Sequence, residues 1–125
     1  MTVGAVRFIA IETLGQKQRR FTEYVGRLIL WAYDNGFELT FGDAYRSPEM
    51  AKLYAEQGKG SQYSLHCERL AVDLNLFVNG KYQTDTAAYE PLGIFWKSLH
   101  SDCAWGGDFR RQDGNHFSLR HGNMA

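Results

Sequence analysis

The segment from Leu70 to Phe77 constrains the fold of this chain more than any other. Its larger aliphatic side chains recur at every second position, which is the period of a β-strand with one buried face. The dipeptide Asn79-Gly80 follows closely and favours the two-residue turn of a β-hairpin. Because such a hairpin joins antiparallel strands, we expect a return strand over residues 81–83 and a sheet that is mostly antiparallel.

Three further segments are predicted to be helical. Residues 16–35 carry an apolar stripe at helical spacing and end before a glycine. Residues 47–57 begin with Ser47, whose hydroxyl is a good N-cap, followed by a proline suited to the first turn. Residues 86–100 form the third predicted helix, which has one apolar face, and Pro91 marks either a break in this helix or its late start.

The remaining strands are predicted over residues 37–41 and, as two short strands joined by a charged loop, within residues 104–119. Helices mixed with mostly antiparallel strands define an α+β fold, with the helices packed on a small sheet. A chain of 125 residues has the size of one domain, and no repeat, linker or low-complexity tract divides it. We therefore expect a single domain over residues 1–125.

The charge balance argues against a general nucleic-acid-binding protein. The chain has 14 lysines and arginines against 14 aspartates and glutamates, whereas nucleic-acid binders usually carry a basic excess. No apolar stretch is long enough to span a membrane. Residues 1–16 place Arg7 and Glu12 inside their apolar part, unlike a signal peptide. We therefore expect a chain made in the cytoplasm without an export signal of its own.

Several polar residues point to a metal site. Asp73 lies in the middle of the apolar strand, where an ionised carboxylate is costly unless it is paired or bound to a metal. A catalytic zinc takes three ligands from histidine and carboxylate side chains and leaves a fourth position for water. His66, Asp73 and His116 can supply that set. Asp113 is placed to stand beside the water without binding the metal, and Asn75 shares a strand face with Asp73.

Each of these residues alone has a simpler interpretation. An aspartate in a strand is more often salt-bridged or at a sheet edge, and a single histidine is usually a surface residue or a satisfied core residue. Cys67 follows His66, but neighbours in a strand point to opposite faces and make a poor nucleophile–base pair. Residues 58–61 lack the leading glycine and the residue order of a phosphate-binding loop, so we expect a loop that borders the cleft.

The order of the polar residues resembles a known family. Residues 64–73 read Ser-Leu-His-Cys-Glu-Arg-Leu-Ala-Val-Asp, and residues 113–116 read Asp-Gly-Asn-His. These segments resemble the motifs of the zinc D-Ala-D-Ala carboxypeptidase and L-alanyl-D-glutamate endopeptidase family, which includes vancomycin-resistance dipeptidases and many phage endolysins. Tyr-Arg-Ser at residues 45–47 and Trp-Gly-Gly within residues 104–109 match further segments of it. The resemblance covers residues 45–119.

The resemblance implies a fold like that of the DD-peptidases and the hedgehog signalling domains, and a single Zn²⁺ ion held by His66, Asp73 and His116. It also implies that Asp113 accepts a proton from the attacking water and later passes it to the leaving amine. These residues would together form a peptidase site.

Three more residues are expected at that site. By resemblance, Arg46 binds a substrate carboxylate or the developing oxyanion. Ser64 is expected to hydrogen-bond the substrate or to orient the His66 segment, and Trp105 to line the cleft. The sequence departs from the family once, because Arg69 stands where the family has a glycine. That glycine would permit unusual backbone angles, so Arg69 bears on the local turn geometry.

The family acts on the short peptides of peptidoglycan, and two bonds are candidates. The small size and the absence of a visible signal peptide favour an L-alanyl-D-glutamate endopeptidase of the phage endolysin type, a monomer released to the periplasm and cell wall by a holin or a secretion system. A D-Ala-D-Ala carboxypeptidase or dipeptidase is the alternative. A zinc-binding module without hydrolysis is a second class, which Asp113 and Arg46 argue against. A phage structural component is a third.

Two cysteines are too few for a disulfide scaffold. In a chain made in the cytoplasm we expect Cys67 and Cys103 to be free thiols, and a bond between them is the alternative.

Overall fold

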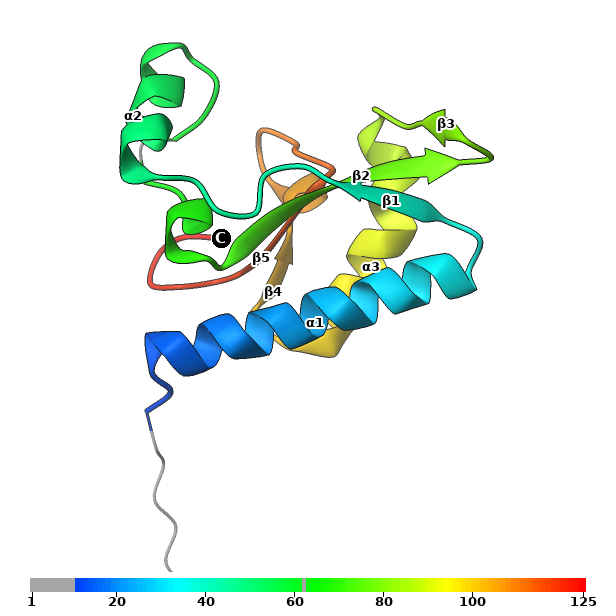
Figure 1. Ribbon diagram of the computed structural model, residues 1–125, viewed down its shortest axis with the longest axis horizontal. Coiled ribbons are helices and arrows are strands. Elements are labelled where there is room, and N and C mark those ends of the chain that lie inside the picture. The colour runs from blue at the N-terminus through cyan, green and yellow to red at the C-terminus, as the bar shows by residue number, and fades with distance from the viewer. Residues whose placement is uncertain (1–10, 62) are drawn as a thin grey trace, which may run out of the picture.

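Strand β2 (Ala71–Val78) is the centre of the sheet in the computed structural model (Figure 1). It pairs along one edge with β1 (Glu38–Phe41) and along the other with β5 (His116–Leu119). Strand β4 (Cys103–Trp105) pairs with the outer edge of β5, which gives the order β1-β2-β5-β4. Strand β3 (Lys81–Tyr82) pairs with the far end of β2. Every pair is antiparallel, and this confirms the predicted α+β fold.

The structure describes residues 11–61 and 63–125. The prediction that no signal peptide opens the chain rests mainly on residues 1–10, which lie outside this description. Within the described residues, none of the helices combines the length and the apolar character that a membrane crossing requires.

The predicted hairpin is present. Asn79 and Gly80 have φ angles of 52° and 75°, as the two central residues of a type I′ turn require. The return strand β3 is one residue shorter than expected, but the amide of Gln83 still donates to the carbonyl of Leu76 at 2.8 Å. The turn therefore fixes how β2 and β3 align.

Helix α1 (Leu14–Asp34) begins two residues earlier than its apolar stripe predicts. Thr13 and Gln16 form a capping box, in which each side chain accepts a hydrogen bond from the other residue's backbone N–H. This cap satisfies amides of the first turn and sets the start of the helix. The face of α1 turned to the core consists of Phe21, Val25, Leu28 and Ala32.

The predicted helix over residues 86–100 consists of two parts. A 3₁₀ turn, Thr86–Tyr89, precedes helix α3 (Glu90–Leu99). Pro91 lies in the first turn of α3, where a missing N–H costs nothing, so the proline marks a late start. The Tyr89 hydroxyl donates to the carbonyl of Gln83 and accepts from an amide of β2, which ties this junction to the sheet.

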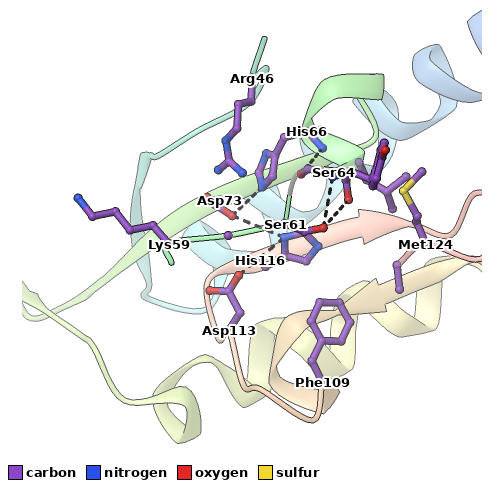
Figure 2. Close-up of a pocket in the computed structure, with 14 residues that line it drawn as sticks. Arg46, Lys59, Ser61, Ser64, His66, Asp73, Phe109, Asp113, His116 and Met124 are labelled. Atoms are coloured by element: carbon purple, nitrogen blue, oxygen red, sulfur yellow. Dashed lines mark hydrogen bonds and ion pairs between the residues drawn. The ribbon is translucent and has the colours of Figure 1, made fainter. Parts of the chain in front are cut away.

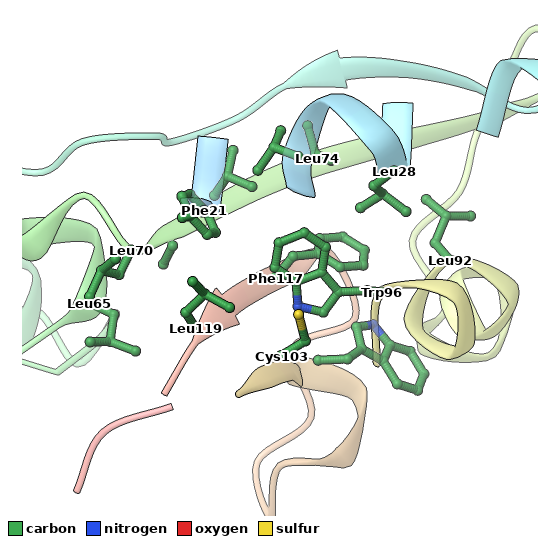
Figure 3. Close-up of a cluster of buried hydrophobic side chains, with 14 of the residues drawn as sticks. Phe21, Leu28, Leu65, Leu70, Leu74, Leu92, Trp96, Cys103, Phe117 and Leu119 are labelled. Carbon is green, nitrogen blue, oxygen red and sulfur yellow. The ribbon is translucent and has the colours of Figure 1, made fainter. Parts of the chain in front are cut away.

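Helices α1 and α3 cover the same face of the sheet, and Trp96 is at the centre of the core between them (Figure 3). Its ring meets Phe21 of α1 edge-on at 5.7 Å and Phe117 of β5 at 6.0 Å. Its indole N–H donates to the carbonyl of Ser118, so the polar atom of this buried side chain is satisfied. Val72 and Leu74 of β2 belong to this core.

Helix α2 (Pro48–Glu56) begins after the predicted N-cap, because the hydroxyl of Ser47 accepts from the amide of Met50 at 3.1 Å. The helix lies beyond one end of the sheet, away from α1 and α3 (Figure 1). Cys67 and Cys103 are free thiols in the structure, as expected.

Two helical glycines offer a matched test of the packing. A methyl group at Gly26 of α1 meets no atom within 4 Å, whereas one at Gly93 of α3 would lie 2.2 Å from the Trp105 ring. Gly26→Ala should raise the free energy of unfolding by about 0.5–1 kcal/mol through helix propensity. Gly93→Ala should lower it by about 1–3 kcal/mol through overpacking. Urea unfolding checks both, and a Gly93→Ala protein as stable as the wild type would contradict the packing of Trp105 on α3.

Candidate metal centre

The three predicted ligands converge in space (Figure 2). One ligand atom from each of His66, Asp73 and His116 lies within 4.8 Å of the other two. The Oδ1 atom of Asp73 is 3.3 Å from Nε2 of His66 and 3.7 Å from Nδ1 of His116. Both imidazoles are buried, and the side chain of Asp73 is 19% exposed.

The sheet register places two of the three ligands. Asp73 of β2 lies directly opposite His116 of β5. Side chains alternate along a strand, so both residues point away from the face that α1 and α3 cover. On the other edge of β2, the backbone of Asp73 is bonded to Gly42 and Asp43. Asp73 therefore lies between residues 42–43 and β5, and backbone hydrogen bonds fix its position along the sheet.

A 3₁₀ turn places the third ligand. The turn spans Leu65–Glu68, and the hydroxyl of Ser64 accepts from the amide of His66 at its start. His66 and Cys67 therefore lie in a turn, and not in the extended strand that the argument about Cys67 assumed. The turn ends at Arg69 with φ of 56°, the left-handed conformation that favours glycine. Arg69 adopts it while its guanidinium stacks 4.1 Å from the ring of Tyr45.

The donor set fits a zinc ion. Four ligands at 2.0–2.1 Å in a tetrahedron stand about 3.4 Å apart, close to the two measured separations from Asp73. The Oδ1 atom of Asp73 is buried and makes no hydrogen bond, although two imidazole nitrogens lie near it. A cation requires this arrangement, in which three potential ligand atoms converge and make no hydrogen bonds to one another.

Electrostatics keep Asp73 ready to bind a cation. Burial raises the pKa of its carboxyl, but the imidazoles of His116 and His66 lower it more, to about 2. The carboxylate is therefore ionised at neutral pH.

Asp113 lies beside the three ligands. Its Oδ2 atom is 4.0 Å from Nδ1 of His116, and its side chain is 55% exposed toward the cleft. Desolvation raises the pKa of Asp113 above its usual value, the imidazole of His116 opposes this shift, and the carboxylate of Asp73 adds to it. A carboxylate with a raised pKa is a better proton acceptor, which suits the predicted role of general base.

Three contacts hold the loop that carries Asp113. The Asp113 amide donates to the carbonyl of Gly106 at 2.9 Å, and the indole N–H of Trp105 donates to the carbonyl of Gly114 at 2.7 Å. The side chain of Asn115 donates to Asn75 of β2 at 3.2 Å. The loop is therefore bonded both to β2 and to the segment after β4.

Trp105 is placed differently from our expectation. Its side chain is buried, and added methyl groups at Gly93 and Gly107 would each lie 2.2 Å from its ring, so the indole fits between these two glycines. The structure does not bring it to the cleft. Sequence reasoning missed that the indole N–H of Trp105 supports the Asp113 loop through the carbonyl of Gly114. The indole is buried because it packs against Gly93, which is distant in sequence, and against Gly107.

Arg46 does line the cleft. Its Nη2 atom donates to Asp43 at 2.8 Å, and its guanidinium lies 5.0 Å from the ring of Tyr54. Its backbone amide donates to the carbonyl of His66, which ties the Tyr45-Arg46 segment to the ligand turn. The buried Nε atom has no hydrogen-bond partner, so the guanidinium still has an unused hydrogen-bond donor although these contacts hold the side chain in place.

The cleft around these residues has a volume of about 450 Å³. Ser64 lines it, and its bond to the His66 amide matches the orienting role, one of the two that were expected of it. Lys59, Gly60 and Ser61 confirm that the loop over residues 58–61 borders the cleft. Figure 2 shows Lys59 and Met124 on opposite sides of the ligand cluster. Met124 and Phe109, which lies 5.3 Å from the ring of His116, form an apolar wall that sequence reasoning missed.

Comparison with known proteins agrees with this geometry. A family model described as D-alanyl-D-alanine carboxypeptidase matches residues 57–119, which include all three candidate ligands. No curated protein matches the chain.

Two solved structures share the fold. The crystal structure of the L-Ala D-Glu endopeptidase ChiX from Serratia marcescens aligns with a TM-score of 0.69 and 18% identity, over 92% of this chain and 90% of that one. A vancomycin resistance D,D-pentapeptidase VanY variant, from a VanB-type cassette and in complex with Zn(II), aligns with a TM-score of 0.55 and 19% identity, over 80% of this chain and 70% of that one.

Removing one ligand tests the metal centre. His116→Ala should weaken zinc binding by more than about 100-fold, because two protein ligands remain of three. His100→Ala is the matched control, since His100 is 40% exposed and lies beside Asp102 rather than the cleft. Metal analysis after dialysis should find one zinc per chain in the wild type and the control. A normal zinc content in His116→Ala would exclude His116 as a ligand.

Proposed function

The chain belongs to the D-alanyl-D-alanine carboxypeptidase family of zinc peptidases that act on peptidoglycan, and we propose that it is an L-alanyl-D-glutamate endopeptidase. The observation that carries the proposal is the convergence of His66, Asp73 and His116 beside Asp113, in a cleft that Arg46 also lines. A structural zinc needs neither a neighbouring free carboxylate nor an arginine, so this arrangement favours hydrolysis over a binding module.

In the proposed mechanism His66, Asp73 and His116 hold the zinc. When bound, the metal polarises the scissile carbonyl and makes water a stronger acid. Asp113 accepts the proton of the attacking water and delivers it to the nitrogen of the departing amine. Its raised pKa suits both steps, because the same carboxyl must take up a proton and then release it.

Arg46 is proposed to bind a substrate carboxylate. Both candidate bonds join the carbonyl of an alanine to a nitrogen whose α-carbon carries a free carboxylate, since D-glutamate is linked onward through its γ-carboxyl. A guanidinium fixed by Asp43 and Tyr54 suits that carboxylate at low entropic cost. The apolar wall of Phe109 and Met124 suits the alanine methyl group.

The extent of the cleft supports cleavage within the stem peptide. A further cavity of about 600 Å³ shares Lys59, Phe109 and Asp113 with the first and continues past Asp113. A terminal D-alanine ends at its carboxylate and leaves such space unused, whereas D-glutamate carries the rest of the stem. The fold neighbour ChiX has the endopeptidase specificity. The description of the family favours D-Ala-D-Ala carboxypeptidase as the second candidate.

The substrate lies in the cell wall, and we propose that the enzyme acts there as a monomer after release by a holin or a secretion system. The location of the substrate is what supports the proposed action at the cell wall.

Digestion of purified Gram-negative peptidoglycan identifies the bond. Mass spectrometry should detect stem peptides that begin with D-glutamate, and a chelator should abolish their release until zinc is restored. The His116→Ala protein is the control for contaminating hydrolases. Release of terminal D-alanine instead would replace the endopeptidase with the carboxypeptidase.

Substitution of Asp113 separates catalysis from metal binding. Asp113→Ala should keep one zinc per chain and lower kcat by about 10²- to 10⁴-fold, because general acid–base catalysis is lost. Asp108→Ala is the control, since Asp108 pairs with Lys97 outside the cleft. Wild-type turnover by the Asp113→Ala protein would show that another group moves the proton.

A further inference from the structure

Two cations line the outer part of the cleft. The cavity that continues past Asp113 is bordered by Lys59 from the loop after α2 and by Arg111 from the loop before β5. Lys59 also borders the inner cavity that holds the ligand cluster. Asp113 is the single acidic residue along the outer cavity, so its lining has one more positive charge than negative.

These cations have no counterion in the part of the chain that the structure describes. The ion pairs there include Arg46 with Asp43 and Lys97 with Asp108, but none that involves Lys59 or Arg111. Both side chains are exposed at the cavity. Two unpaired cations from different loops that face one cavity attract an anion in a ligand.

We propose that Lys59 and Arg111 form a second carboxylate subsite, which recognises the diamino acid after D-glutamate in the stem peptide. The proposal rests on the proposed endopeptidase function and adds a preference to it. Diaminopimelate carries a free carboxylate at the far end of its side chain, and lysine has a hydrogen there. The two stem peptides otherwise share the same backbone.

Charge explains the direction of the preference. The far end of diaminopimelate combines an ammonium with a carboxylate, so the carboxylate can pair with Lys59 and Arg111. The far end of lysine is an ammonium alone, which the same two cations repel. Both groups are exposed, so each pair contributes modestly and salt weakens the effect. Arg46 lies in the inner cavity, nearer the ligands, and is the proposed partner of the D-glutamate carboxylate.

Two synthetic peptides test the subsite. They are L-Ala-γ-D-Glu-X-D-Ala amides, in which X is meso-diaminopimelate or L-lysine, so they differ by one carboxylate and the terminal carboxyl is blocked. The zinc-loaded wild type should have a kcat/KM about tenfold higher on the diaminopimelate peptide at low salt. The ratio should fall to about three in Lys59→Met or Arg111→Met, because each cation supplies about half of the free-energy difference, and toward one in the double variant.

Matched variants control for general effects of charge. Arg110→Met removes the neighbouring cation, and Lys52→Met removes a lysine of α2. Neither residue borders the two cavities. Both variants should keep the wild-type ratio, and raising the salt concentration should lower it in the wild type and in both controls. Equal kcat/KM values on the two peptides in the wild type, or an unchanged ratio in the double variant, would overturn the subsite.

Product binding separates the two proposals. Calorimetry with γ-D-Glu-X-D-Ala amides measures the preference without turnover, and the diaminopimelate product should bind about tenfold more tightly to the wild type. If neither peptide is cleaved but this binding preference exists and is lost in the double variant, the endopeptidase function is wrong and the subsite stands. If the peptides are cleaved and the two products bind equally, the subsite is wrong and the endopeptidase stands.

Discussion

The antiparallel pairing of β2 with β5 is the interaction on which the rest of the site depends. It sets Asp73 opposite His116, and the carbonyl of Asn115 accepts from the amide of Leu74 one step further along. A shift of one residue would turn Asp73 toward Trp96 and the core, because side chains alternate along a strand. The apolar residues Val72 and Phe117, which face each other on the core side, oppose that shift. Burial of the core thus fixes the distance between two of the candidate metal ligands.

The packing of Trp105 is a second constraint on the site. The ring of Trp105 fits between Gly93 of α3 and Gly107, and its N–H holds the carbonyl of Gly114. Gly106 has no room for a side chain either, since a methyl group there would lie 2.0 Å from the carbonyl oxygen of Asp113. Three glycines therefore let helix, indole and loop approach closely enough to fix the proposed base. Because the core is closely packed, it fixes the position of the loop that carries Asp113 at the cleft.

Much of the fold could be predicted because its signals are local. The alternation over residues 70–77, the turn at Asn79-Gly80 and the cap at Ser47 each depend on residues that are neighbours in sequence. The candidate ligands emerged from residue type and from the resemblance, and the structure brings them together. The loop over residues 58–61 could be placed at the cleft, but the burial of Trp105 and the meeting of Lys59 with Arg111 at the outer cavity could not be predicted, because they depend on which distant segments meet. The 3₁₀ turn at His66 was missed since a four-residue turn leaves almost no periodicity to detect.

The candidate ligands and the outer cations lie on different kinds of backbone. Asp73 and His116 belong to paired strands, whereas Lys59 and Arg111 stand on connections that no strand pairing restrains. Substitution at the ligands disturbs a buried sheet, while substitution at Lys59 or Arg111 changes a solvated surface at little cost in folding free energy. Two of the three candidate ligands are therefore placed by strand pairing within the sheet. Substitution at Lys59 or Arg111 can thus change the proposed preference for the diamino acid while the strand pairing that places Asp73 and His116 is kept.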